Sequence, residues 1–185
     1  MIIKNIKKKI KVKYANQSNE RKIKYLEEQG SKIGKGTRLL CGVEAFGTEP
    51  YLIEVGRDCL FSGGIHLITH DGGIVVLNNL NYFDNKQMDK IAPIKIGDNV
   101  YIGSGAYVLP GITIGDNVII GGCTVVTKNI PSNSVVAGIP GRIISTIDEY
   151  YQKALNNNVL YPTLGMSQED KKAYFMNLKN KVAVK

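Results

Sequence analysis

A six-residue repeat runs without a gap through residues 96–131 and limits what this chain can fold into. The six segments are IGDNVY, IGSGAY, VLPGIT, IGDNVI, IGGCTV and VTKNIP. Each begins with a β-branched aliphatic residue, and the fifth position of each is apolar or small. Such a period predicts short strands that wind around a shared axis, because a single unit cannot bury its apolar face alone.

The remaining positions of the repeat predict tight corners. Four of the six second positions are Gly, and five of the six fourth positions are Gly or Asn. These residues adopt left-handed backbone angles most readily. Each repeat therefore predicts a short strand, an inward aliphatic side chain and a corner. Three repeats close one triangular coil, so residues 96–131 form two coils.

The repeat extends upstream and then breaks. Residues 33–37 and 55–67 follow it less regularly, whereas residues 72–93 contain no repeat at all. A stretch of this length inside a compact domain is usually functional or disordered, and we expect a loop extruded from the coils.

The two ends of the chain differ from its centre. Helix-forming residues predict a helix in 16–29 and helices in 145–157 and 167–180. The expected organisation is an N-terminal basic and helical segment (1–30), a repeat domain (31–144) and a C-terminal helical extension (145–185).

The formal net charge of +8 is concentrated at the N-terminus. Six lysines lie within the first fourteen residues, with isoleucines between them at helical spacing. One interpretation is a basic amphipathic helix that rests weakly on an anionic membrane. The preferred interpretation is a solvated helix or a frayed arm, because the segment is short and its far end is polar. The lysines are Lys4, Lys7, Lys8, Lys9, Lys11 and Lys13.

Several classes of protein are disfavoured by composition. No apolar run approaches 18 residues, and no signal-peptide pattern is present, so we expect a cytoplasmic protein. The three cysteines form neither a disulfide framework nor a CxxC metal pair. No pattern typical of nucleic-acid recognition accompanies the basic charge, so no nucleic-acid partner is expected.

The repeats, the THDGG segment (69–73) and the segment VVTKNIPSNSVVAGIPGRII (125–144) resemble the hexapeptide-repeat acyltransferases. Within that family the resemblance is strongest to sugar O-acetyltransferases and to acetyltransferases of capsule and lipopolysaccharide synthesis. The resemblance implies an all-β fold, a left-handed parallel β-helix with flanking N- and C-terminal helices. It also implies a homotrimer with active sites between neighbouring copies, acetyl-CoA as acyl donor, and a saccharide hydroxyl as acceptor.

The chain has only two histidines, and they differ in expected role. His70 lies where the family carries its catalytic histidine, which implies that it takes the proton of the acceptor hydroxyl. His66 precedes an inward Leu67 and should point away from the core. Residues four apart in an extended strand lie about 13 Å from each other. The two histidines of one chain therefore cannot chelate one ion, although a symmetric trimer could share ligands, and we expect no metal requirement.

A catalytic imidazole needs a partner that holds its tautomer. Asp71 is the neighbour in sequence and is the candidate named with His70, although adjacent side chains tend to diverge. Glu54, Asp58, Asp84 and a backbone carbonyl are equally possible.

The resemblance also implies residues that bind CoA. Ser104 matches a position whose backbone N–H faces the thioester oxygen, and Gly122 matches one where small residues let the pantetheine arm pass. Thr127, Lys128 and Arg142 match residues near the nucleotide phosphates, where cations neutralise charge.

The acceptor is less constrained than the donor. Asn81, Tyr82 and Asp84 of the 72–93 loop are candidates for binding a sugar through hydrogen bonds and ring stacking. The sugar-specific branch has an upstream asparagine, but residues 41–47 contain none. Serine, an amino-sugar nitrogen or an antibiotic remain alternative acceptors, and a non-catalytic scaffold remains the alternative function.

Overall fold

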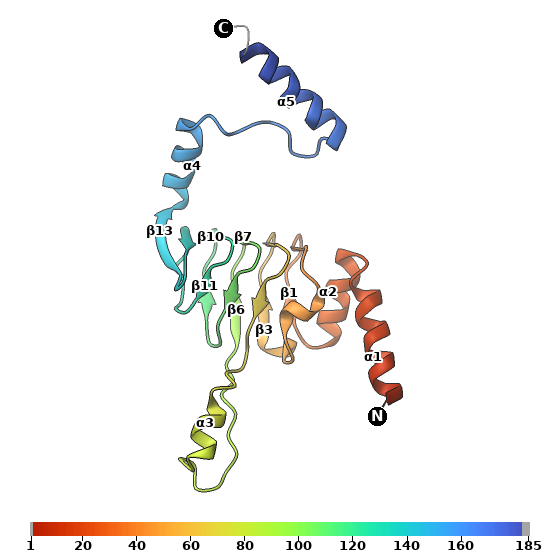
Figure 1. Ribbon diagram of the computed structural model, residues 1–185, viewed down its shortest axis with the longest axis vertical. Coiled ribbons are helices and arrows are strands. Elements are labelled where there is room, and N and C mark those ends of the chain that lie inside the picture. The colour runs from red at the N-terminus through yellow and green to blue at the C-terminus, as the bar shows by residue number, and fades with distance from the viewer. Residues whose placement is uncertain (1, 183–185) are drawn as a thin grey trace. The chain divides into compact units, whose positions relative to one another are not determined.

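The computed structural model describes residues 2–182 and contains three β-sheets whose strands the chain visits in turn (Figure 1). The first sheet contains β1 (Lys32–Ile33), β3 (Ile53–Val55), β6 (Ile94–Ile96) and β9 (Thr113–Ile114). The second contains β2 (Arg38–Leu39), β4 (Leu60–Phe61), β7 (Val100–Ile102), β10 (Val118–Ile120), β12 (Ser134–Ala137) and β13 (Arg142–Thr146). The third contains β5 (His66–Leu67), β8 (Tyr107–Val108) and β11 (Val125–Val126). This succession confirms a parallel β-helix.

The repeat positions stack in register along the coils. Ile96 pairs with Ile114, Ile102 with Ile120, and Val108 with Val126. All six are at most 4% exposed, which confirms the predicted inward register. The same columns continue upstream through Val55, Phe61 and Leu67. Each side chain removed from water in this way contributes roughly 1.5–3 kcal/mol.

The corners also follow the prediction, with one exception. Five of the six fourth positions have positive φ, and they are Asn99, Gly105, Gly111, Asn117 and Cys123. Asn129 lacks this conformation. Its side-chain carbonyl instead accepts a hydrogen bond from the Thr113 backbone N–H at 2.8 Å, and the chain then leaves the repeat.

The first and last coils depart from the regular pattern. In the first coil a 3₁₀ helix, η1 (Val43–Phe46), replaces the third strand and lies against β5. A second short turn, η2 (Pro50–Leu52), leads into β3. At the other end β13 pairs antiparallel with β12 and covers its edge.

Two helices precede the coils. Helix α2 (Asn19–Glu28) begins at Ser18, whose side chain accepts the Arg21 backbone N–H, and it buries Leu26 completely against β1 and β2. Helix α1 (Ile2–Ala15) packs on α2. Helix α2 thus lies within the predicted 16–29 segment, and the basic segment before it is helical.

The 72–93 segment leaves the coils as an arm that contains α3 (Ile74–Asn79) (Figure 1). The C-terminal helices α4 (Ile147–Asn156) and α5 (Gln168–Val182) match the predicted ones closely. Residues 1–150 and 151–185 form separate compact units. In the second unit the ring of Tyr161 packs edge-on against Tyr174 and Phe175. No helix in the described part of the chain is long and apolar enough to cross a membrane.

Replacing Ile114 by Ala should lower the free energy of unfolding by about 2–5 kcal/mol, because the side chain is 1% exposed and its loss leaves a cavity. Urea denaturation at equilibrium measures this change. Thr113→Ala, an outward position of the same strand, is the matched control and should cost much less. Equal effects would contradict the inward register.

Candidate active site

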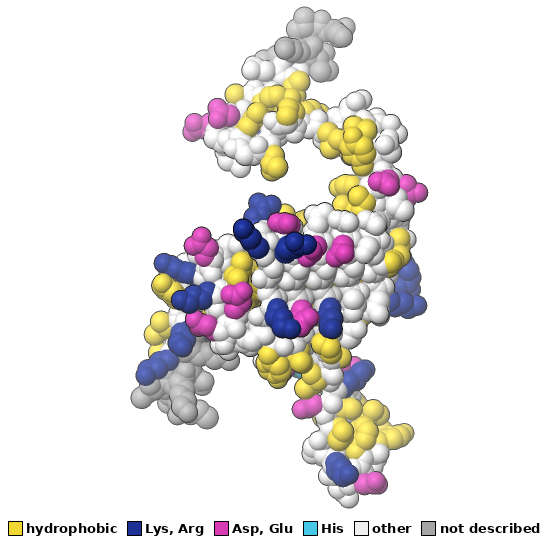
Figure 2. All heavy atoms as spheres, turned by 180° about the vertical axis from the view of Figure 1, so that it is seen from behind, with side chains coloured by type: hydrophobic (Ala, Val, Ile, Leu, Met, Phe, Trp, Pro, Cys, Tyr) yellow, Lys and Arg dark blue, Asp and Glu magenta, His cyan; other side chains and the backbone are white. Residues whose placement is uncertain are grey.

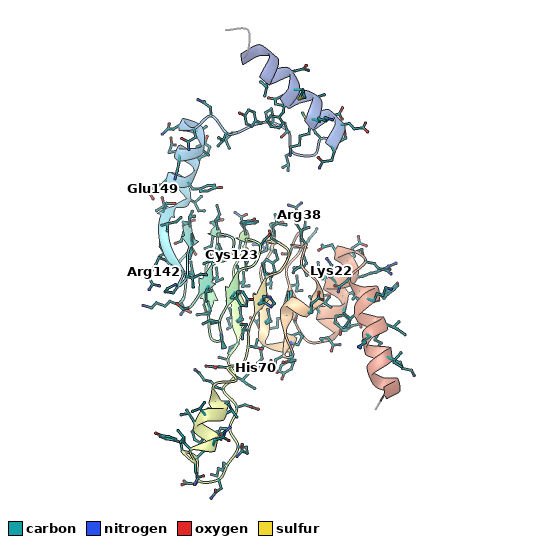
Figure 3. All side chains as sticks on the ribbon, viewed as in Figure 1. Lys22, Arg38, His70, Cys123, Arg142 and Glu149 are labelled. Atoms are coloured by element: carbon teal, nitrogen blue, oxygen red, sulfur yellow. The ribbon has the colours of Figure 1, made fainter. Side chains whose placement is uncertain are left out.

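His70 lies where the arm leaves the coils (Figure 3). Its backbone is held by a short antiparallel ladder between the two legs of the arm. His70 bridges Ile91, the Asp71 N–H donates to the Lys90 carbonyl at 2.8 Å, and the Ala92 N–H donates to the Thr69 carbonyl at 2.9 Å. The side chain of His70 is 52% exposed. The ladder thus fixes the backbone while the imidazole faces solvent.

The partner of the His70 ring is Glu49, which lies between η1 and η2. The His70 Nδ1 atom is 3.0 Å from Glu49 Oε2. Thr69 Oγ1 donates to the same oxygen at 2.6 Å, and Thr48 Oγ1 donates to Oε1 at 2.7 Å. These contacts hold a carboxylate that is only 16% exposed against the imidazole.

The protonation state of Glu49 determines which tautomer of His70 can bond to it. The hydrogen bond from Thr69, then that from Thr48, and to a smaller extent His70 lower the pKa of Glu49 to about 2. An ionised carboxylate only accepts hydrogen bonds, so Nδ1 of His70 must carry the proton that it donates to Glu49. In the tautomer that donates from Nδ1, Nε2 has a free lone pair, which can accept a proton from a bound hydroxyl.

Asp71, the candidate named with His70 in the sequence, forms its hydrogen bonds with other residues. The Asp71 carboxylate accepts hydrogen bonds from Lys90 Nζ at 2.7 Å and from the Gly73 N–H at 2.9 Å, and it closes the base of the arm instead. Glu54, another candidate, pairs with Lys32. Glu49 was missed because it lies outside the repeats. The signal available in the sequence was that residues 43–52 do not follow the repeat. In the structure this interruption replaces the third strand of the first coil and places Glu49 beside His70.

A shallow recess of about 170 Å³ lies beside His70. Its lining includes Glu44, Thr48, His66 and Thr69. His66 points outward as predicted, and its ring stacks on that of Tyr107 with centroids 4.6 Å apart. Pockets that enclose a small ligand usually have about 300–1,000 Å³. The recess of a single chain is therefore too small to enclose a sugar.

Two of the residues predicted to bind CoA are stacked on one corner. Ser104 and Gly122 lie in successive coils between the second and third sheets, and the Cys123 N–H donates to the Ser104 carbonyl at 2.8 Å. A Cβ atom on Gly122 would lie 3.2 Å from that carbonyl oxygen. Among residues 2–182 no acceptor binds the Ser104 N–H, so this donor is available to a ligand.

The three other residues predicted to bind CoA lie further along the coils. Thr127 and Lys128 follow β11, whereas Ser104 and Gly122 precede β8 and β11, so the two sets lie at opposite ends of the strands of the third sheet. Arg142 begins β13, where the Gly141 N–H donates to the Val125 carbonyl at 2.8 Å. All three are exposed, and Lys128 and Arg142 form no ion pair within the described residues.

Comparison with known proteins decides the family. The profile described as "Bacterial transferase hexapeptide (six repeats)" matches residues 93–128. Protein CapG of Staphylococcus aureus is 37% identical over 153 residues, which cover 82% of this chain and 86% of CapG. The chain belongs to the hexapeptide-repeat acyltransferases.

Further relatives agree with this assignment. Galactoside O-acetyltransferase of Escherichia coli (strain K12) is 37% identical over 128 residues, which cover 67% of this chain and 61% of that enzyme. The solved structure of a maltose O-acetyltransferase from Clostridium difficile 630 shares 28% identity and a TM-score of 0.52, over 75% of this chain and 83% of that one. The chain is thus an acetyltransferase of this family, whose coils are left-handed.

The arm of this acyltransferase does not bring its predicted sugar-binding residues to His70 of the same chain. Asn78 forms two hydrogen bonds with the Met88 backbone, at 2.9 and 3.0 Å, and these join the legs of the arm. Asn81, Tyr82 and Asp84 lie beyond this junction, whereas His70 lies at the base (Figure 3). Asn81 accepts the Asn85 N–H at 2.6 Å, and Tyr82 is 70% exposed.

No group of three or more potential metal ligands (His, Cys, Asp or Glu) occurs within residues 2–182.

Glu49→Gln should lower kcat by roughly 10²–10⁴-fold, because the amide no longer fixes the tautomer that leaves Nε2 free. Steady-state release of CoA thiol measures the effect. Asp71→Asn is the matched control, since an exposed ion pair with Lys90 contributes little, and it should change kcat by less than about threefold. A larger loss in Asp71→Asn than in Glu49→Gln would contradict the assignment.

The pH dependence of stability provides a second test of Glu49. Its pKa is lower in the folded chain than the ordinary value of 4.5. The carboxylate therefore stabilises the fold fully above that value, and the stabilisation is lost as the pH falls toward about 2. The difference in unfolding free energy between the wild type and Glu49→Gln should shrink between about pH 6 and about pH 3. A difference that is constant or grows on acidification would be inconsistent with a lowered pKa.

Proposed function

We propose that this acyltransferase moves the acetyl group of acetyl-CoA to a hydroxyl of a saccharide, with His70 as general base. The observation that carries the proposal is the Glu49–His70 pair, which leaves Nε2 of an exposed imidazole free at the edge of the coils. Sugar O-acetylation is favoured because galactoside and maltose O-acetyltransferases are among the relatives.

In the proposed reaction Nε2 of His70 removes the hydroxyl proton as the acceptor oxygen attacks the thioester carbonyl. The tetrahedral intermediate carries negative charge on the former carbonyl oxygen, and the free Ser104 N–H is the donor proposed to stabilise it. Collapse of the intermediate breaks the carbon–sulfur bond and expels CoA thiolate, which takes the proton back from His70. Glu49 stays ionised throughout and stabilises the transient imidazolium.

Gly122 leaves room for the pantetheine arm along the coils in this proposal. The exposed side chains of Thr127, Lys128 and Arg142 bind the nucleotide phosphates, with the two cations providing charge-assisted hydrogen bonds. No metal ion is required, because a general base and backbone donors suffice for acyl transfer from a thioester.

The active site is completed by a neighbouring copy in a homotrimer. Two observations support this. The recess beside His70 is only about 170 Å³, and the arm exposes Val75, Val76 and Leu80 by more than half (Figure 2). Apolar side chains gathered in this way mark an interaction surface. Asn81, Tyr82 and Asp84 at the end of the arm are then proposed to bind the acceptor of an adjoining copy.

Glu44 takes the place of the asparagine that the resemblance leads one to expect in the acceptor site. It lines the recess beside His70, and its Oε2 accepts a hydrogen bond from Asn16 Nδ2 at 3.0 Å. A carboxylate accepts hydrogen bonds from neighbouring sugar hydroxyls. Glu44→Ala is therefore expected to raise the acceptor KM more than it lowers kcat.

His70→Ala should lower kcat by roughly 10²–10⁴-fold with only a small change in the unfolding midpoint, because the base and one exposed contact with Glu49 are lost while the fold stays intact. The assay is release of CoA thiol with a panel of acceptors: hexosides, amino sugars, serine and aminoglycosides. Light scattering should give three times the mass of one chain. Equal activity of the variant would show that His70 is not the general base. Turnover with only serine or an amine would show that the acceptor is not a saccharide.

A further inference from the structure

Helix α1 is the outermost element at the N-terminal end of the coils (Figure 1), and it has two apolar faces. Ala15 is 2% exposed, and Val12 packs against the same core. Ile6, Ile10 and Tyr14 are spaced four residues apart and are 52%, 63% and 57% exposed. They form a second apolar stripe, which contributes nothing to the core of its own chain.

The charged side chains of α1 itself all have one sign. The first carboxylate in the sequence is Glu20, so α1 carries lysines and no acid. Figure 2 shows Lys and Arg side chains over the N-terminal helices, with Asp and Glu side chains among them. The guanidinium of Arg21 also lies 4.2 Å from the centre of the Tyr14 ring. The exposed lysines with described side chains are Lys7, Lys9, Lys11 and Lys13.

Helix α2 adds charges of both signs on the side that faces α1. A groove of about 580 Å³ lies between the two helices, with Ile10 and Tyr14 in one wall. Glu20 and Glu28 line it from α2. Arg21, Lys24 and Lys11 line it as well, so cations outnumber acids even within the groove.

We infer that α1 docks this enzyme onto an anionic lipid bilayer. The Ile6–Ile10–Tyr14 stripe inserts among the acyl chains near the headgroups, and the flanking lysines contact the lipid phosphates. A second copy of α1 is a poor occupant of the stripe, because two helices that carry only positive charge repel each other. The proposed trimer would present three such helices at one end, which raises the avidity for a surface.

The test is co-sedimentation of the full chain with vesicles of phosphatidylcholine containing about one-third phosphatidylglycerol. We expect binding that weakens as salt rises, and almost none to pure phosphatidylcholine. Lys7→Gln, Lys9→Gln and Lys11→Gln together should weaken binding by about 10²-fold, because each lysine near such a surface contributes about fivefold. Ile6→Ser with Ile10→Ser should weaken it by about tenfold or more.

A matched control removes the same charge elsewhere. Lys153→Gln, Lys171→Gln and Lys172→Gln alter exposed lysines of the C-terminal helices and should leave vesicle binding within about threefold of the wild type. The substituted α1 side chains are exposed, so the unfolding midpoint and acetyl transfer to a soluble acceptor should not change. These readouts separate failure of this inference from failure of the proposed catalytic function.

Three results would overturn the inference. The first is absence of binding to the anionic vesicles. The second is an equal loss in the control and the α1 lysine variants, which would indicate an effect of net charge alone. The third is a changed oligomeric mass in Ile6→Ser/Ile10→Ser with vesicle binding intact, which would assign the stripe to contacts between copies.

Discussion

The stacking of one aliphatic side chain above another around the coil axis supports every other feature of this structure. Ile102 and Ile120 pair across parallel strands and are completely buried. The column leaves no room for a shift of register, since moving a strand by one residue would turn these side chains outward. Close approach at the corners adds to this constraint. A Cβ atom on Gly103 would lie 2.5 Å from the Gly122 nitrogen of the next coil, so the coils can stack tightly only with glycine there.

This rigid stack brings the candidate site together from distant parts of the sequence. Glu49 enters from the insertion in the first coil, and His70 follows the third strand of the second. Thr69 and Thr48 hold the carboxylate in place, so the geometry of the imidazole does not depend on the far end of the arm. The ladder between residues 69–71 and 90–92 serves the same purpose for the backbone. The arm can therefore be long without disturbing the position of the His70 side chain.

The structure also separates two kinds of exposed apolar surface. The exposed apolar side chains of the arm do not line the recess beside His70, and a neighbouring copy is the partner proposed for them. The stripe on α1 lies at the end of the coils and is surrounded by lysines. Its chemistry differs from that of the arm, and for that reason we assign it a different partner.

Periodicity determined the coils, the inward residues and the corners, because each of these depends only on residues within one or two repeats. It also located the arm and the flanking helices, since these are where the period stops. The sequence singled out His70, but the role of Glu49 depends on a contact between residues 21 positions apart. Neither residue belongs to a repeat, so no spacing rule connects them. The outward direction of the Ile6–Ile10–Tyr14 stripe likewise follows from the inward packing of Val12 and Ala15, which only the tertiary structure shows. Helical spacing groups side chains on a face, but only tertiary packing decides which face is covered.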